Sequence, residues 1–221
     1  MRTRVAGLLL IPAAVLGGCA GGRDTALTAA AAAGDRPELV RLVAAGADPD
    51  EVDGRGWSPL IWAVRNGHFK LVPLLAGQGA AVDARAADDR GWPALMHAVA
   101  ARELDAVRAL LNAGADPNVA GNDDTTALML AAGYGYFRTT RVLLERGADP
   151  ALRNESGETA LARAVRGVVE LDHITLGSCQ TDTVRVLTRA SPEPRLAENS
   201  WPMRLARWKR CSEILELAGA G

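Results

Sequence analysis

Cysteine and histidine are the residues of this chain best suited to nucleophilic or metal chemistry, and both are scarce. The three cysteines are Cys19, Cys179 and Cys211, and the three histidines are His68, His97 and His173. No two histidines are four residues apart, as a helical zinc motif requires, and neither Cys179 nor Cys211 has a second ligand at a zinc-like spacing. The sequence therefore predicts no metal site and no cofactor.

Other catalytic patterns are also missing. Gly133-Tyr134-Gly135 lacks the third glycine and the preceding strand of a phosphate-binding loop. Paired acids such as Asp88-Asp89 and Asp123-Asp124 are explained by turn formation. We therefore predict no catalytic residues and a chain that is not an enzyme. One alternative is a hydrolase that pairs His173 with Cys179.

The composition narrows the class of protein further. The chain has 221 residues, of which 48% are hydrophobic, with 25 Lys and Arg against 26 Asp and Glu. This balance gives no basic surface, so we expect no nucleic-acid partner, and no small-molecule substrate is expected. No apolar run reaches the roughly 20 residues that span a bilayer, which excludes a multi-pass membrane protein.

The N-terminal segment has the form of a secretory signal. Arg2 and Arg4 precede an apolar stretch over residues 5–16. The following Leu16-Gly17-Gly18-Cys19 resembles the lipobox of bacterial lipoproteins. This resemblance implies a signal peptide over residues 1–18, acylation of Cys19 and a short tether over residues 19–24. Ala20 favours a lipid anchor at the outer membrane, facing the periplasm of a bacterial cell envelope.

Two phrases recur along the rest of the chain at a period near 33 residues. The first phrase begins at Gly46, Gly79, Gly114 and Gly147, and the second is anchored on Leu27, Leu60, Leu95, Leu128, Leu161 and Met203. Each phrase lies at a nearly constant offset from the other, which indicates a repeated structural unit.

The phrases resemble ankyrin repeats. The resemblance is carried by Ser58-Pro59-Leu60-Ile61-Trp62-Ala63, by Thr126-Ala127-Leu128-Met129-Leu130-Ala131-Ala132 and by Thr159-Ala160-Leu161. It implies an all-α solenoid of stacked helix-turn-helix units with β-hairpin fingers over residues 25–221. We predict about six units, each with a Ser or Thr N-cap and with the Gly-Ala-Asp phrase ending its second helix.

The chain departs from the family pattern in two ways. The motif's histidine position is held by Thr28, Ile61, Met96, Met129, Ala162 and Arg204, so we expect stability to rest more on packing. The fifth unit is about nine residues too long, which places an insertion at residues 167–178 between its two helices. The last unit is predicted to be a C-terminal cap.

Cys179 and Cys211 fall near equivalent points of the fifth and sixth units. Stacked helices lie about 8 to 10 Å apart, whereas a disulfide needs Cα atoms about 4.4 to 6.8 Å apart. A disulfide is therefore possible where the insertion lets the two residues approach, and two free thiols are the alternative.

The repeat register also predicts which side chains face a partner. The position facing the concave surface holds Trp62, His97, Leu130 and Arg163, and the finger position before each motif holds Trp57 and Trp92. Arg65, Tyr134 and Arg166 extend the same face. Interface hot spots are rich in Trp, Tyr and Arg, so these residues are the predicted protein-binding surface. The alternative is that Trp57 and Trp92 pack on their own repeat.

These features together predict a membrane-anchored ankyrin module that captures, inhibits or scaffolds an unidentified protein partner in the periplasm. Neutralisation of a toxin or secreted effector is one form this activity could take. The alternative is a structural envelope lipoprotein in a permanent assembly.

Overall fold

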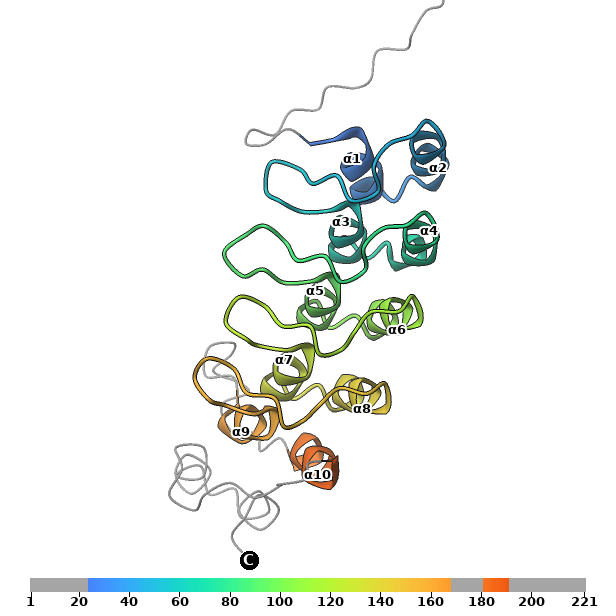
Figure 1. Cartoon of the computed structure of the whole chain (residues 1–221). Coiled ribbons are helices and arrows are strands. Elements are labelled where there is room, and N and C mark those ends of the chain that lie inside the picture. The colour runs from blue at the N-terminus through green and yellow to red at the C-terminus, as the bar shows by residue number, and fades with distance from the viewer. Residues whose placement is uncertain (1–23, 168–180, 191–221) are drawn as a thin grey trace, which may run out of the picture.

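The computed structural model of the chain describes residues 24–167 and 181–190. In these residues the chain forms short helices that stack in pairs (Figure 1). They are α1 (Ala26–Ala33), α2 (Arg36–Ala44), α3 (Pro59–Arg65), the 3-10 helix η1 (Phe69–Leu71), α4 (Val72–Gly77), α5 (Ala94–Ala100), α6 (Leu104–Asn112), α7 (Ala127–Gly133), α8 (Phe137–Glu145), α9 (Ala160–Arg166) and α10 (Thr181–Ala190). Helices this short are unstable alone, so they depend on packing against one another.

The helices form two rows. The first helices of the units, α1, α3, α5, α7 and α9, contact one another in order along the stack, and the second helices lie beside them (Figure 1). Helix α10 packs on both α8 and α9, so it occupies the second-helix place of the fifth unit. Nearly all of the expected insertion at residues 167–178 lies outside the described residues.

Hydroxyl side chains begin the first helices, as the sequence predicts. The side chains of Thr25, Ser58, Thr126 and Thr159 each accept a hydrogen bond from the backbone N–H three residues later, at 3.1–3.4 Å. Such a cap stabilises a helix by about 1 kcal/mol. The third unit differs because Pro93 precedes α5 and offers no side-chain cap.

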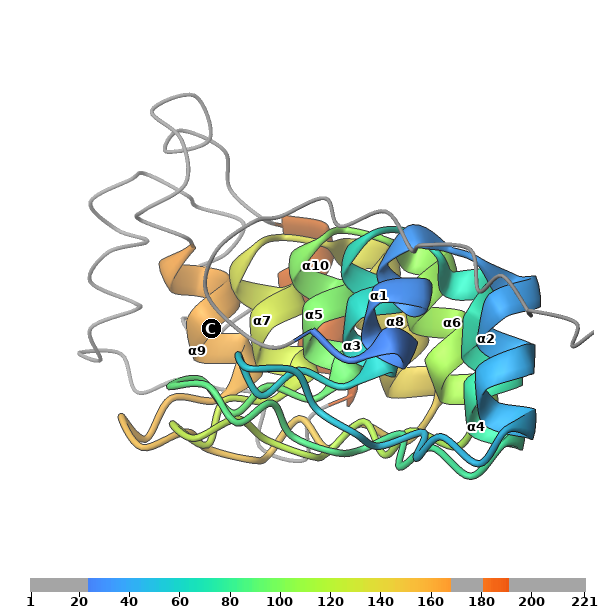
Figure 2. The same ribbon diagram turned by 90° about the horizontal axis from the view of Figure 1, so that it is seen from above.

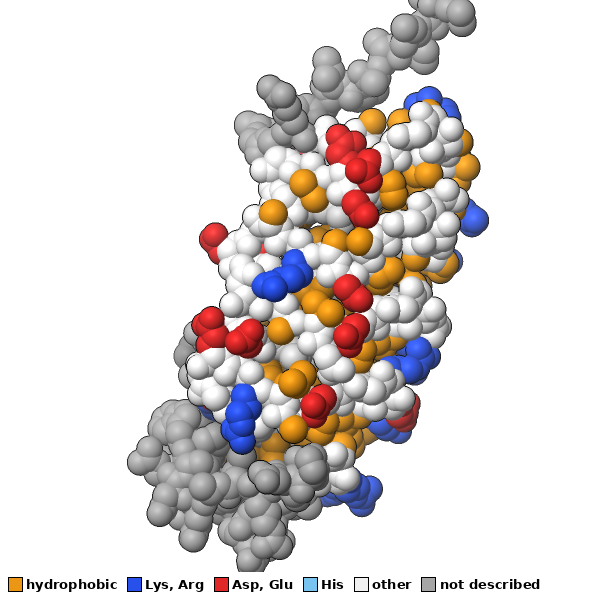
Figure 3. Space-filling view, viewed as in Figure 1, with side chains coloured by type: hydrophobic (Ala, Val, Ile, Leu, Met, Phe, Trp, Pro, Cys, Tyr) orange, Lys and Arg blue, Asp and Glu red, His pale blue; other side chains and the backbone are white. Residues whose placement is uncertain are grey.

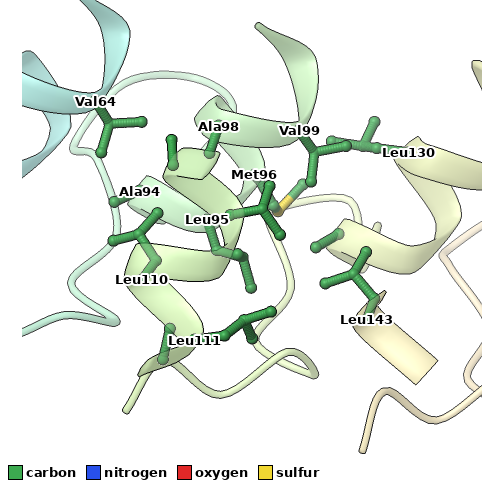
Figure 4. Packing of buried hydrophobic residues seen from close by; sticks show 14 of the residues in the cluster. Val64, Ala94, Leu95, Met96, Ala98, Val99, Leu110, Leu111, Leu130 and Leu143 are labelled. Atoms are coloured by element: carbon green, nitrogen blue, oxygen red, sulfur yellow. The ribbon is translucent and has the colours of Figure 1, made fainter. Parts of the chain in front are cut away.

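One hydrophobic core runs through all the described units. Leu95 of α5, Leu110 of α6, Leu130 of α7 and Leu143 of α8 lie in the same cluster, which crosses from one unit to the next (Figure 4). Met96 stands where the family motif has histidine and is fully buried in this core. Packing therefore replaces the hydrogen bonds of the missing histidine, as expected.

Hydrogen bonds between units add to this packing, which the sequence analysis did not anticipate. One side chain at the base of each of the first three fingers accepts from the backbone of the next unit: Asp50 from Ala81, Asp83 from Asp116 and Asn118 from Asp149, at 2.7–3.1 Å. Figure 3 shows that Asp and Glu side chains recur along the stack on the face viewed there. Acidic residues of the fingers therefore have a structural role.

The fingers are extended loops that gather on one side of the first helices (Figure 2). Two of them are closed by a single antiparallel bridge, Arg85 with Pro93 and Ala120 with Thr126, and the described residues contain no longer strand. The expected β-hairpins are therefore reduced to single bridged pairs in these fingers.

Candidate protein interface

Two fingers carry the same pattern of side chains, 35 residues apart. The first is Asp53-Gly54-Arg55-Gly56-Trp57 and the second is Asp88-Asp89-Arg90-Gly91-Trp92. The repeat register predicts the two tryptophans as interface residues but not the aspartates and arginines, although the recurrence of Asp-x-Arg-Gly-Trp is a signal for all of them. The equivalent residues 121–125 and 154–158 contain neither Arg nor Trp.

The buried carboxylate of Asp53 ties its finger to helix α3. Asp53 is only 4% exposed. One of its oxygens accepts from the backbone N–H groups of Arg55 and Trp57, and the other accepts from the indole Nε1 of Trp62, all at 2.9 Å. The finger turn and the Trp62 ring are thus held by a single charged group, and hydrogen bonds to such groups are among the strong ones.

Asp88 repeats this arrangement and connects two fingers. Its carboxylate accepts from the backbone N–H groups of Arg90 and Gly91 and, at 3.1 Å, from the indole Nε1 of Trp57. Partial burial opposes ionisation, but the hydrogen bonds from Trp57, Gly91 and Arg90 outweigh it, and the pKa of Asp88 lies below its usual value. The first finger's tryptophan is therefore fixed by the second finger.

The tryptophan rings cover His97. The Trp57 ring lies edge-on to Trp62 at 5.0 Å and tilted to His97 at 5.9 Å, and Trp92 meets His97 at 5.7 Å. Sequence analysis placed His97 on the concave surface, but it is 3% exposed because these rings lie over it. Trp57 packs on Trp62 of its own unit and also reaches His97 of the next, while Trp92 packs on the α5 histidine of its own unit.

His97 is held as a neutral ring. The guanidinium of Arg65 lies 3.3 Å from its Nδ1, and because a guanidinium can only donate, Nδ1 accepts. Its Nε2 is buried without a hydrogen-bond partner among the described residues. The pKa of His97 is lowered to about 4, mainly by burial. The positive charges of Arg65 and Arg90 contribute to this lowering of the pKa, while the negative charge of Asp88 opposes it.

Three arginines lie over the tryptophan faces. The guanidinium carbon of Arg65 is 4.3 Å from the centre of the Trp57 ring, that of Arg55 is 5.4 Å from Trp62 and that of Arg90 is 4.8 Å from Trp92. We call these six residues the Trp–Arg cluster. Its three tryptophans are half-buried and its three arginines are exposed, so rings and cations share one surface.

The other predicted interface residues do not join this cluster. Leu130 was expected on the concave surface, but it is buried because it packs in the core between units. The guanidinium of Arg163 donates to the Thr125 hydroxyl at 3.3 Å, and that of Arg166 pairs with Glu158 at 2.9 Å. The predicted surface therefore divides into two regions.

Tyr134 belongs to a third feature, at the turns between helices. Its ring stacks on Tyr136 at 5.2 Å, and the guanidinium of Arg102 lies 5.5 Å from the Tyr136 ring. A groove of about 360 Å³ passes here between Arg102, Tyr136 and Phe137. These residues line the helical turns, so Tyr134 does not extend the Trp–Arg cluster.

Several predicted residues lie outside the described part of the chain: Cys19, His173, Cys179 and Cys211, with the predicted signal peptide over residues 1–18. Within residues 24–167 and 181–190, no group of three or more His, Cys, Asp or Glu side chains could hold a metal ion. No helix in the same residues is long and apolar enough to cross a membrane.

Comparison with known families agrees with the repeat architecture. A family model described as three copies of ankyrin repeats matches residues 27–121, and one described as many copies of ankyrin repeats matches residues 110–164. Together the matches extend over more than half of the chain. The chain therefore belongs to the ankyrin-repeat family, whose members are protein–protein interaction modules.

Two curated relatives share part of this region. A putative ankyrin repeat-containing protein of Treponema pallidum (strain Nichols) is 42% identical over 81 residues, which are 37% of this chain and 27% of that protein. The B-cell lymphoma 3 protein homolog of Mus musculus is 39% identical over 109 residues, 48% of this chain and 24% of that protein. The chain thus matches about a quarter of the length of each relative.

Proposed function

We propose that this chain is a non-enzymatic protein-binding module whose Trp–Arg cluster contacts the partner. The observation that carries the proposal is the fixing of Trp57 and Trp62 by the carboxylates of Asp88 and Asp53, with arginines over their faces. Tryptophan and arginine supply much of the binding energy at interfaces. A surface that is already rigid loses less entropy on binding, which favours affinity.

We also propose that the module is lipid-anchored in a bacterial cell envelope, at the outer membrane and facing the periplasm. The proposal rests on Leu16-Gly17-Gly18-Cys19 and the apolar residues before it. There the module acts by occlusion or scaffolding, and neutralisation of a toxin or effector is one form of occlusion. The test is fractionation of a Gram-negative host: the native chain partitions with membranes and Cys19→Ser does not. Equal partition of both chains would contradict the anchor.

The binding proposal is tested by affinity capture from an envelope extract, with residues 20–221 as bait. The first variant is Trp92→Ala, which leaves the hydrogen bonds of Asp53 and Asp88 in place, and the second is Trp57→Ala/Trp92→Ala. The matched control, Tyr134→Ala/Arg166→Ala, alters the rest of the predicted surface. Circular dichroism of each bait establishes that it is folded.

We expect the native bait and the control to recover the same protein, and both tryptophan variants to lose it. Recovery that is unchanged in folded tryptophan variants but lost in the control would contradict the proposal. A bait that purifies as a permanent assembly through the cluster would instead favour a structural envelope lipoprotein.

A further inference from the structure

We propose that the partner segment that docks on the Trp–Arg cluster is acidic, with Asp or Glu carboxylates next to apolar side chains. This inference rests on the proposed function and adds the chemistry of the partner. The inference rests on which charged groups at the cluster already have partners in the described residues and which do not.

The arginines of the cluster have no acidic ion-pair partner in the part of the chain that the structure describes. Arg55, Arg65 and Arg90 make no ion pair with any carboxylate of the described residues. Each guanidinium lies over a tryptophan ring, and that of Arg65 also donates to Nδ1 of His97. A planar guanidinium with free edges matches the two oxygens of a carboxylate.

The two aspartates that hold the cluster, Asp53 and Asp88, already accept hydrogen bonds from within the chain. Each of Asp53 and Asp88 accepts hydrogen bonds from two backbone N–H groups and from an indole. They are therefore occupied in holding the fingers and tryptophans and do not pair with the arginines. The charges of the six cluster residues are therefore positive and lie next to apolar ring surface, although the exposed Asp89 stands beside Arg90 in the second finger.

The fifth unit shows what an arginine of this fold does when an acid is available. Arg166 pairs with Glu158, which stands at the finger position held by Trp57 and Trp92 in the earlier units. Where the finger residue is tryptophan, no carboxylate of residues 24–167 or 181–190 forms an ion pair with the cluster arginines. A carboxylate from a partner would make the equivalent contact there.

The rest of the molecule does not attract acidic chains in general. The whole chain has a formal net charge of −1, and acidic side chains recur along the face shown in Figure 3. Long-range attraction is therefore weak, and the acidic side chains of that face would repel an acidic segment. An acidic segment is therefore expected to bind at the cluster and not at the acidic face shown in Figure 3.

The test measures binding of short fluorescein-labelled peptides to residues 20–221 by fluorescence anisotropy. Three peptides share one pattern, repeats of Glu-Glu-Phe, Gln-Gln-Phe or Lys-Lys-Phe, so only charge differs. We expect the acidic peptide to bind about tenfold more tightly than the neutral one, with affinity that falls as salt is raised. Equal or weaker binding of the acidic peptide would overturn the inference.

Site-directed variants then locate the effect. Arg55→Gln/Arg90→Gln removes two charges that lie over tryptophan rings, and Arg108→Gln/Arg146→Gln removes two exposed charges from the second-helix row. We expect the first pair to weaken acidic-peptide binding about fivefold or more and the control to change it less than about twofold. The inference fails if both pairs act equally, or if Arg102→Gln alone removes binding.

The two proposals can fail separately. If capture of the partner is lost with Trp92→Ala but unchanged with Arg55→Gln/Arg90→Gln, the cluster binds a protein without acidic recognition, and only this inference falls. If capture is unchanged in all these folded variants, the proposed function itself falls.

Discussion

The first and second fingers share their backbone course with the third and fourth, yet the two pairs differ in what their side chains do. Trp57 and Trp92 correspond to Thr125 and Glu158 in the repeat register. In the first pair, aspartates hold tryptophans, and the arginines over the rings make no ion pair with a carboxylate of the described residues. In the second pair, Arg163 donates to the Thr125 hydroxyl and Arg166 pairs with Glu158. The same fold therefore carries two surfaces. In the first, which we call open, the arginines lack a carboxylate partner among the described residues; in the second, which we call closed, Arg166 is paired with Glu158.

The largest expected effect comes from Asp53→Ala. The change removes the buried acceptor of three hydrogen bonds, from two backbone N–H groups and the indole of Trp62. We therefore expect the free energy of unfolding to fall by about 2–4 kcal/mol. The equivalent Asn154→Ala loses one side-chain hydrogen bond, from the backbone of Glu158, and we expect about 1 kcal/mol. Urea unfolding of the two variants measures the difference. Equal losses would remove the distinction between the two pairs of fingers.

The second prediction uses pH. The pKa of His97 is about 4 when folded against 6.5 as its ordinary value, so the unfolded chain binds a proton more readily between these values. Stability therefore falls as pH drops from 6.5 to 4, by at most about 3 kcal/mol, and this contribution is absent above pH 6.5.

His97→Leu isolates this effect, because it removes the titrating ring and keeps an apolar side chain beneath the tryptophans. We expect its unfolding free energy to change less over this pH window than that of the native chain. The same slope in both proteins would show that His97 is not held neutral by the cluster.

The third prediction compares one left-handed finger position in two units. Gly56 has φ 75° and Gly157 has φ 73°, so alanine is strained at both. A Cβ at Gly56 would also lie 2.5 Å from the Cβ of Ala87 in the next finger, whereas Gly157 has open space. We expect Gly56→Ala to cost about 2–4 kcal/mol and Gly157→Ala about 1 kcal/mol, read from thermal unfolding. A larger cost at Gly157 would contradict the close approach of the first two fingers.

The smallest effects concern single arginines. Arg166→Gln breaks a partly exposed ion pair with Glu158, and Arg55→Gln removes a guanidinium from a tryptophan face. We expect each to change the unfolding free energy by less than about 1 kcal/mol. Only Arg55→Gln should weaken partner binding, which calorimetric titration with the captured partner measures. If only Arg166→Gln weakened binding, the partner would bind the second pair of fingers and not the first, which would contradict the assignment of the open surface.

The repeat pattern predicts most of the fold because its signals are local. Thr126 caps the helix that begins one residue later, and the apolar period alone sets the buried face of that helix. The burial of His97 was not predictable in this way, since it depends on rings from residues 40 positions before it and 5 before it. The role of Asp53 was missed for a related reason: its indole donor, Trp62, follows on a helix whose orientation the sequence does not state.

The most direct test of the central claim is hydrogen–deuterium exchange of residues 20–221 with and without the captured partner. We expect the partner to protect residues 53–65 and 88–97, which contain the Trp–Arg cluster and His97, and to leave residues 123–134 and 154–166 unchanged. Protection confined to residues 123–134 and 154–166 would contradict the account, because it would place the partner on the surface that the chain has already closed with its own side chains.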